Sequence, residues 1–486
     1  MDGVAAVPAE PPRWRWLPPV GSARYYLLLG LLGMGLLGPL GAVTAAYMNF
    51  SLGFFVGGQV LAGILGSAVT FGYGAQGQHG ANYIQTSAAS VAGLGGLGVL
   101  LQAQVWMGMP PVPAWQMVLY LTCVGLLGVG VGMLYTPLLV DRMRLSFPSG
   151  AAVAHLLRAL TDPGLLRRSL VRLAGGAAAG LVTGLGAGRI ATLGAIEWSA
   201  STFGAGLVVG ARVGLPAALA GGLAWLATPG FVAIGWLAPG DPFRKITFLI
   251  ALGLILGAGL VDLARLACGA LRRTPPQAPP APPESAGPRV RMGHLVMWVL
   301  AWAGATALAG VHIFGESWSH MAVTLALVGV FALINGIAVG VSDYNPISSA
   351  FVVTVLVLAA FGLWDPLLGL MAGAVLLVAT SVASDMQQDR STGWRLGSNR
   401  ALQFRFQVAG LLVGALIAVG LAQLFLAAYP VLRLDQTLMK ADETPAQWSS
   451  AMTYKLVGAL RSLSDPGPHQ IAAIAWGAGI GVAVQA

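Results

Sequence analysis

Two aspartates, Asp385 and Asp389, stand four residues apart in a polar stretch, SDMQQDRSTGWRLG, between two strongly apolar runs. Residues at this spacing are neighbours on one face of a helix, so the two carboxyl groups could hold a cation or relay a proton. The alternative is that they cap a helix at a solvated surface, where Arg390 and Arg395 anchor the chain at the membrane. The apolar helix before them is expected to end near Ala383.

A third acid, Asp343, lies in GVSDYNPISSA, which interrupts two other apolar runs. Pro346 removes a backbone hydrogen-bond donor there, and at membrane depth only a cavity or neighbouring protein can compensate for that loss. One interpretation is a broken helix that lines a substrate or ion pathway. The other is a short surface loop in which Asp343 caps a helix, and spacing alone does not separate the two. Asp365, which directly precedes a proline, is predicted to be a helix cap.

Several catalytic and cofactor motifs are absent from the sequence. It has no Walker A lysine motif, no HExxH and no GxSxG, and no two histidines have metal-ligand spacing. The letters of GLGGLG, residues 93–98, match the glycine pattern of dinucleotide-binding sites. The segment lies inside an apolar run with no strand before it, so its glycines favour close packing of helices instead. We therefore expect no cofactor, no metal site and no ATP-driven motor, so any pumping must use another energy source such as an ion gradient.

The chain that must position these residues belongs in a lipid bilayer. Of its 486 residues, 56% are hydrophobic and 9% are charged, against roughly a quarter charged in soluble domains. Apolar runs of about 18 to 25 residues recur, each long enough to cross the hydrocarbon core as a helix. The arginines behind the net charge of +9 lie in short loops rather than on one patch, so no nucleic-acid partner is expected. The fold class is an all-α polytopic integral membrane protein.

About 14 transmembrane helices are expected, in two halves and with some helices broken. A tail (1–24) precedes the first half (25–268), and a proline-rich linker (269–292) separates it from the second half (293–486). The positive-inside rule places the tail, and hence the N-terminus, and the linker in the cytoplasm, with the helices in the plasma (inner) membrane. The expected spans are 25–46, 53–73, 82–107, 116–140, 169–190, 196–211, 214–237, 244–267, 293–312, 320–341, 347–364, 366–383, 403–428 and 469–484.

Four stretches together resemble the oligopeptide transporter family, which includes the yellow stripe-like branch. NYIQTSAASVAG is similar to the family's ENxIVQTxAS, RLSFPSGAAVAHLLRAL to LPFPSGxAxAxxLxAL, VGVSDYNPIS to VGETxxNPIG, and SDMQQDRSTGWRLG to GDMMQDLKTGYLLG. The sequence departs from these patterns at Ala81, which replaces an acid, at Ser348, which replaces a glycine, and at Ser391, which replaces a lysine whose charge Arg390 would supply. In order and spacing, the four motifs cover nearly the whole chain.

The resemblance implies a secondary transporter that imports small oligopeptides or peptide-like metal chelates by alternating access, coupled to protons. Its partners would be these substrates, protons and the lipid bilayer, and a homo-oligomer is left open. Protonation can neutralise acids in a low-dielectric interior. The proton-coupling candidates are Asp343, Asp385 and Asp389. The candidates for neutral hydrogen bonds to substrate are Asn82, Gln85, Thr86, Ser149 and Asn345.

Two further expectations stand beside this interpretation. A polytopic membrane enzyme acting on a lipid-linked substrate would use paired acids to bind a metal, and only Asp385 and Asp389 have suitable spacing. Prokaryotic members of the family continue through further terminal helices, whereas this sequence ends at GVAVQA inside an apolar run. A prokaryotic-type member with a short C-terminus is therefore one expectation.

Overall fold

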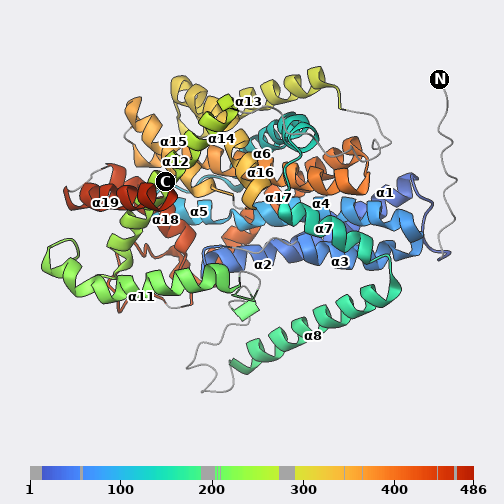
Figure 1. The fold of residues 1–486 in the computed structure, drawn as a ribbon, viewed down its shortest axis with the longest axis horizontal. Coiled ribbons are helices and arrows are strands. Elements are labelled where there is room, and N and C mark those ends of the chain that lie inside the picture. The colour runs from blue at the N-terminus through green and yellow to red at the C-terminus, as the bar shows by residue number, and fades with distance from the viewer. Residues whose placement is uncertain are drawn as a thin grey trace.

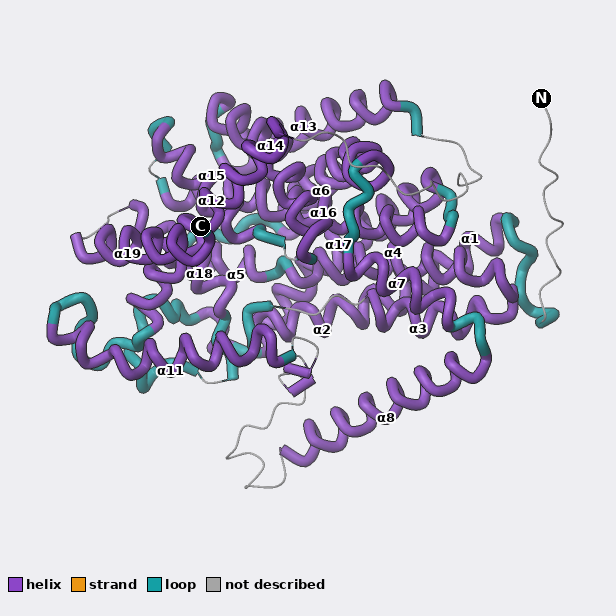
Figure 2. Tube along the Cα trace, in the orientation of Figure 1, coloured by secondary structure: helices purple, strands orange, loops and turns teal. Residues whose placement is uncertain are grey.

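The structure is a computed structural model, which describes residues 14–54, 59–187, 203–204, 206–207, 210–272, 290–343, 345–363, 365–445, 447–464 and 468–486. Within these residues the regular secondary structure is helical and contains no strand (Figure 2). The expected all-α fold class is confirmed.

The first part of the chain opens with α1 (Ala23–Gly30), a π-helical segment η1 (Leu31–Leu37) and α2 (Gly38–Ser51), which follow one another directly. Among the helices that come next, α7 has only 12 residues, which is too short to cross a bilayer. These helices are α3 (Gln59–Thr70), η2 (Phe71–Gln76), α4 (Gly77–Gly96), α5 (Val99–Trp106), α6 (Ala114–Thr136), η3 (Pro137–Arg142), α7 (Pro148–Ala159), α8 (Pro163–Ala187) and α11 (Ala211–Ala233).

The second part of the chain supplies the longest helices, and α16, with 31 residues, runs through the middle of the bundle (Figure 1). Its residues 369–380 are all buried, against α4, α6, α14 and α15 among others. The helices of this part are α12 (Arg244–Arg272), α13 (Met292–Phe314), α14 (Trp318–Ser342), α15 (Ile347–Ala360), α16 (Pro366–Leu396), α17 (Arg400–Ala428), η4 (Pro430–Arg433), α18 (Ala451–Ser464) and α19 (Pro468–Gln485).

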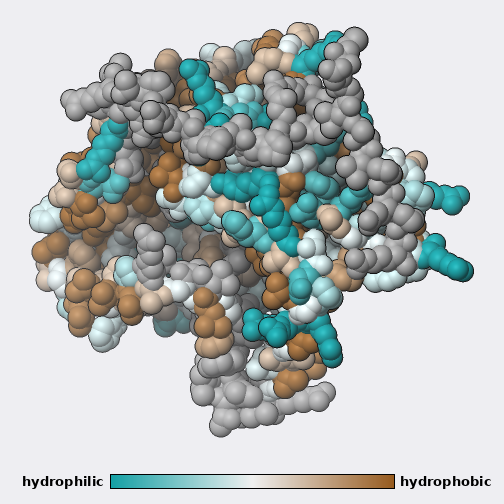
Figure 3. Space-filling model, turned by 45° about the vertical axis from the view of Figure 1, so that its right-hand side comes forward, coloured by the Kyte–Doolittle hydropathy of each residue, from teal (hydrophilic) through white to brown (hydrophobic). Residues whose placement is uncertain are grey.

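Two helices of the first part, α8 and α11, expose most of their apolar side chains. α8 stands apart from the bundle in Figure 1, and large side chains such as Leu181 on α8 and Leu223 on α11 are 65% and 67% exposed. Figure 3 shows extensive hydrophobic surface on one face of the molecule. A soluble protein rarely exposes so much apolar surface, whereas a bilayer solvates it.

The described part contains 10 helical segments long and apolar enough to cross a membrane, and most match the expected spans. The segments expected at 53–73 and 82–107 correspond to α3 and to α4 with α5, and a kink at Gly74 (φ 59°) in η2 separates them. Two further expected spans correspond to the shorter helices α15 and α19. The span expected at 196–211 and the linker at 269–292 lie largely outside the described residues.

One expected boundary is wrong. The helix that was predicted to end near Ala383 continues to Leu396, where Gly397 (φ 74°) ends it in the left-handed conformation. The polar sequence after Ala383 had suggested an exit from the membrane, but neighbouring helices bury most of this segment and the backbone stays helical. At the other end of α16, Asp365 accepts hydrogen bonds from the N–H groups of Leu367 and Leu368, so its predicted capping role is confirmed.

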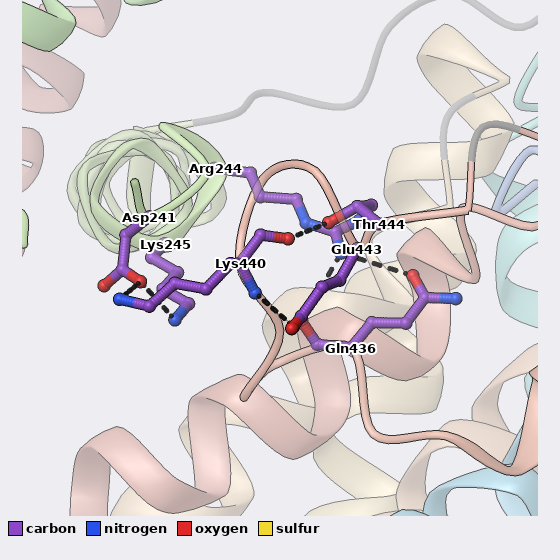
Figure 4. A network of polar contacts seen from close by, with 7 residues as sticks. All are labelled: Asp241, Arg244, Lys245, Gln436, Lys440, Glu443 and Thr444. Carbon is purple, nitrogen blue, oxygen red and sulfur yellow. Dashed lines mark hydrogen bonds and ion pairs between the residues drawn. The ribbon is translucent and has the colours of Figure 1, made fainter. Parts of the chain in front are cut away.

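The segment between α17 and α18 is fastened to the start of α12 by a charged network (Figure 4). Asp241 accepts hydrogen bonds from Lys245 at 3.0 Å and from Lys440 at 2.8 Å. Burial raises the pKa of Asp241, but the hydrogen bonds from the two lysines outweigh this and hold the pKa below its ordinary value. Arg244 Nη2 donates to the side chain of Gln436 at 3.3 Å. The network brings segments about 200 residues apart to one end of the bundle.

Glycines let α12 and α19 approach until their backbones touch. A Cβ added to Gly253 would lie 2.0 Å from the carbonyl oxygen of Ile474, and one added to Gly477 would lie 2.0 Å from that of Ile250. Small residues at such spacing are a recurrent way to bring membrane helices together, because dispersion contacts replace the hydrophobic effect there. Backbone-to-backbone packing thus holds together two helices that lie far apart in the sequence.

Replacing Gly253 by Ala should therefore destabilise the protein, by about 1 to 3 kcal/mol for an overpacked contact. Gly259 lies on the same helix with nothing within 4 Å of its added Cβ, so Gly259→Ala is the matched control. Thermal unfolding in detergent should show a lower Tm for Gly253→Ala alone. Equal Tm values for the two variants would contradict the close packing of α12 and α19.

Candidate functional site

The second half of α16 carries polar side chains into the protein interior. Gln387, Arg390 and Ser391 are fully buried, and Ser384, Asp389 and Thr392 are nearly so. A helix of 31 residues is about 45 Å long, longer than the roughly 30 Å hydrocarbon core. The polar part is covered by α4, α7, α14 and α17, so it is enclosed by protein rather than solvated.

Asp389 faces α4, where it meets two of the residues predicted to bind substrate. Gln85 Nε2 donates a hydrogen bond to Asp389 Oδ1 at 2.8 Å, and the Thr86 hydroxyl faces the same carboxyl group. Asp389 Oδ2 is buried and has no hydrogen-bond partner within the described protein. One oxygen of this carboxyl group is therefore held by α4, while the other keeps its hydrogen-bonding capacity.

Gln403 on α17 connects the same site to a third helix. Its Nε2 donates to the backbone carbonyl of Asp389 at 2.6 Å and to Thr86 Oγ1 at 3.2 Å. Its Oε1 accepts from Arg390 Nη1 at 2.7 Å. One amide side chain thus links α4, α16 and α17, and a displacement of any one helix changes its contacts with the other two.

Arg390 is a fully buried cation in this cluster. Its Nε and Nη2 atoms have no hydrogen-bond partner in the part of the chain that the structure describes. Nearby, Arg400 forms an ion pair with Asp141, with Nη1 2.6 Å from Oδ2. Among the described residues, Gln403 is thus the hydrogen-bond partner of Arg390, which retains two donor groups that suit a carboxylate or a carbonyl oxygen.

Asp385 lies one helical turn before Asp389 and is partly accessible. Its Oδ2 lies 3.2 Å from the point that a Cβ on Gly93 would occupy, so the carboxyl group rests against bare backbone of α4. Among the described residues, no hydrogen bond or ion pair to this carboxyl group is present. A carboxyl group without donors has no local compensation for a negative charge in a protein interior.

Other buried polar atoms without partners belong to the same helices. Each such group costs roughly 1 to 3 kcal/mol when it stays unpaired, and native proteins keep few of them. Their number on these helices indicates an interior built to exchange hydrogen bonds with polar molecules. Within the described chain they include both amide atoms of Asn82 and Asn335 and single oxygens of Gln85, Ser384, Gln387 and Gln407.

A second polar group lies at the break between α14 and α15, where the chain leaves the helix at Asp343 (φ 64°). Asp343 Oδ1 accepts from the Ser149 N–H at 3.1 Å, and its Oδ2 accepts from the Ser149 hydroxyl. Gln388 Nε2 of α16 donates to the same carboxylate at 3.0 Å. Asp343 therefore caps the N-terminus of α7. Phe147, the residue at the N-cap position of α7, makes no side-chain capping hydrogen bond.

The structure thus divides the eight predicted site residues into two groups. Gln85, Thr86 and Asp389 are in contact, and Asn82 and Asp385 lie one turn away on the same two helices. Asp343 and Ser149 form the separate pair at the helix break, followed by Asn345, whose Oδ1 is buried without a partner among the described residues. The chain is interrupted between α14 and α15, as both interpretations of this sequence expect, and the exposed Asp343 caps a helix, as the surface-loop alternative expects. The pathway, binding and coupling roles stay predictions.

Sequence reasoning did not find Gln403 and Gln407. Both precede the apolar part of α17, in RALQFRFQ, and stand four residues apart, so they lie on one helix face. Their spacing matches that of Asp385 and Asp389, and this was the signal in the sequence that could have identified them.

A comparison with family models gives a match to the model described as OPT oligopeptide transporter protein, over residues 29–261 and 282–485. The chain belongs to the oligopeptide transporter family. Proteins of this family are transporters and not enzymes, so the resemblance found in the sequence is confirmed and the lipid-enzyme hypothesis is wrong. No curated protein matches the chain. As an oligopeptide transporter it is an integral membrane protein, in agreement with its apolar helices.

The contacts of Gln403 predict a measurable loss of stability when it is replaced by Leu. This change leaves Arg390 and Thr86 without their shared partner, at an expected cost of about 1 to 3 kcal/mol. Gln423 is exposed on the same helix, so Gln423→Leu is the matched control. Tm in detergent should fall for Gln403→Leu and stay near the wild-type value for Gln423→Leu. A Tm unchanged by Gln403→Leu would contradict the linking role of this amide.

Proposed function

We propose that this oligopeptide transporter is a secondary active importer of small oligopeptides or peptide-like metal chelates, coupled to protons and working by alternating access. We further propose that it acts in the plasma (inner) membrane with its N-terminus in the cytoplasm. The observation that carries this proposal is the pair of acids on one face of α16, the buried Asp389 and the partly accessible Asp385, beside unpaired amides of α4.

The two aspartates support proton coupling because of what surrounds them. A carboxyl group in a protein interior is charged at a large cost, which binding a proton removes. Asp389 has a donor in Gln85, whereas Asp385 has none within the described protein. In the proposed cycle Asp385 takes up and releases the proton. Asp389 lies one helical turn away, so the change of charge on Asp385 acts on it.

The neutral side chains beside these acids suit a peptide backbone. Asn82, Gln85 and Thr86 lie on successive turns of α4 and offer amide and hydroxyl groups, which pair well with peptide N–H and C=O groups. The free donors of Arg390 suit a terminal carboxylate. Ser149 and Asn345 would contact substrate nearer the helix break. A substrate would thus replace hydrogen bonds that the closed protein leaves unmade.

Alternating access requires a part that moves, and the helix break supplies a candidate. Asp343, Ser149 and Gln388 join the end of α14 to α7 and α16 at an exposed position. Gln388 Oε1 also accepts from Gln59 of α3 at 3.2 Å. These contacts are accessible to water, so they can exchange at low cost. In our proposal their rupture opens one mouth of the pathway and releases Asp343, the third candidate for proton coupling, from Ser149.

Uptake by the purified protein in sealed liposomes tests the proposed function. Labelled di- to hexapeptides and ferric chelates should accumulate when an inward proton gradient is imposed, and an uncoupler should abolish the accumulation. No uptake of any of these substrates into vesicles with correctly inserted protein would contradict the proposal.

Single Asn substitutions test the coupling residues in the same assay. Asp385→Asn should lower gradient-driven uptake at least about tenfold, because it removes the exchangeable proton while it retains the volume of the side chain. Asp389→Asn and Asp343→Asn should each reduce the dependence of uptake on pH. Asp442 is exposed between α17 and α18, so Asp442→Asn should behave as wild type. If pH-dependent uptake survives both Asp343→Asn and Asp385→Asn, the coupling assignment is wrong.

A further inference from the structure

A buried acid lies at the corner between α13 and α14. Gly315 (φ 76°) ends α13, and the Ser317 side chain caps α14. Between them, Glu316 is only 2% exposed. Both of its carboxyl oxygens are buried without a hydrogen-bond partner in the described chain. An acid in a tight turn between helices is ordinarily solvated, so this inward orientation needs an explanation.

The groups around Glu316 do not compensate for a negative charge. Tyr120 of α6 lies close to it, but the Tyr120 hydroxyl already donates a hydrogen bond to the Met371 carbonyl at 3.0 Å. Asp365, at the start of α16, adds a second carboxylate. On the adjoining helices, His312 is exposed, and the His320 ring contacts the Phe361 carbonyl. The groups that these contacts place near Glu316 are therefore an acid and a phenol whose hydrogen bond is already made.

These surroundings favour the protonated form of the carboxyl group. Burial first, and the neighbouring Asp365 carboxylate second, raise the pKa of Glu316 to about 8. Water at the corner would return the pKa of Glu316 toward its ordinary value, because desolvation is the larger cause of the raised pKa. The proton on Glu316 is thus linked to the closure of this corner.

This site is distinct from the polar cluster around Asp389. Asp385 follows Asp365 by 20 positions, which is about 30 Å along a helix axis. Glu316 and Asp365 therefore lie near one end of α16, while Asp385 and Asp389 lie toward the other. Figure 1 shows α13 and α14 at the edge of the bundle, and Trp318 at the start of α14 is 57% exposed. The corner is thus placed where it can open without disturbing the polar cluster.

We propose that Glu316 is a second proton-binding site, occupied while the α13–α14 corner is closed and emptied when that corner opens to water. On opening, the carboxyl O–H bond breaks, the proton passes to water and a carboxylate remains; closing reverses the step. Its part in transport rests on the proposed function, whereas its occupancy by a proton does not.

Infrared spectra of the full-length protein in detergent test the occupancy directly. The wild type at pH 7 should show a protonated carboxyl C=O band that is absent from Glu316→Gln and is lost as the pH rises through about 8. Asp442→Asn should retain the band. Identical pH 7 spectra for the wild type and Glu316→Gln would overturn the proposal. Should Glu316→Gln not fold, Glu316→Asp keeps a carboxyl group and must shift the band.

Thermal stability gives a second readout with a defined sign. The folded protein holds the Glu316 proton up to a higher pH than the unfolded chain does, so stability must fall as the pH rises from about 4.5 to about 8. The wild type should therefore lose more Tm than Glu316→Gln across this window. Parallel Tm profiles for the two proteins would contradict proton binding by Glu316 in the folded state.

Uptake separates the failure of this inference from that of the proposed function. Glu316→Gln should lose gradient-stimulated uptake but retain exchange of labelled for unlabelled peptide across the vesicle membrane. Full gradient stimulation in Glu316→Gln would overturn its role in transport while the importer proposal stands. If the wild type itself shows no uptake, the importer proposal fails, and the infrared band decides whether Glu316 binds a proton.

Discussion

The structure depends on how the polar half of α16 is enclosed. In a membrane protein every buried polar group needs a partner, because lipid offers none. Gln403 meets this requirement for three helices, since its amide joins Thr86 of α4, the Asp389 carbonyl of α16 and the Arg390 guanidinium. The buried atoms that still lack a partner among the described residues belong to Asp389, Arg390 and nearby amides. The bundle is thus stable enough to enclose these groups and leaves bonding capacity where a substrate or a proton can use it.

The parts of this arrangement that follow local rules were predictable. Proline after Asp365 indicated a helix cap, which is present, and Pro346 indicated an interruption of the apolar run, which lies between α14 and α15. Long-range partners were not predictable, because spacing along the chain says nothing of contacts between residues 194 positions apart, such as Asp343 and Ser149. The end of α16 was placed too early because polar sequence was equated with solvent, whereas α4, α14 and α17 cover it.

Close backbone packing and buried acids have complementary roles in the same bundle. The glycines of α12 and α19 fix two helices against each other, and the network around Asp241 fastens the segment after α17 to the same region. By contrast, the contacts at the helix break are exposed side-chain hydrogen bonds. Closely packed helices and exchangeable contacts therefore lie within one chain, an arrangement that fits the proposed alternating access.

The central claim is that peptide and proton cross the membrane together. Proteoliposomes loaded with a pH-sensitive dye, with equal pH on both sides, measure this directly when a permeating peptide is added outside. The account predicts acidification of the interior as labelled peptide enters, and little acidification with Asp385→Asn. Entry of peptide into wild-type vesicles without any change of internal pH would contradict it.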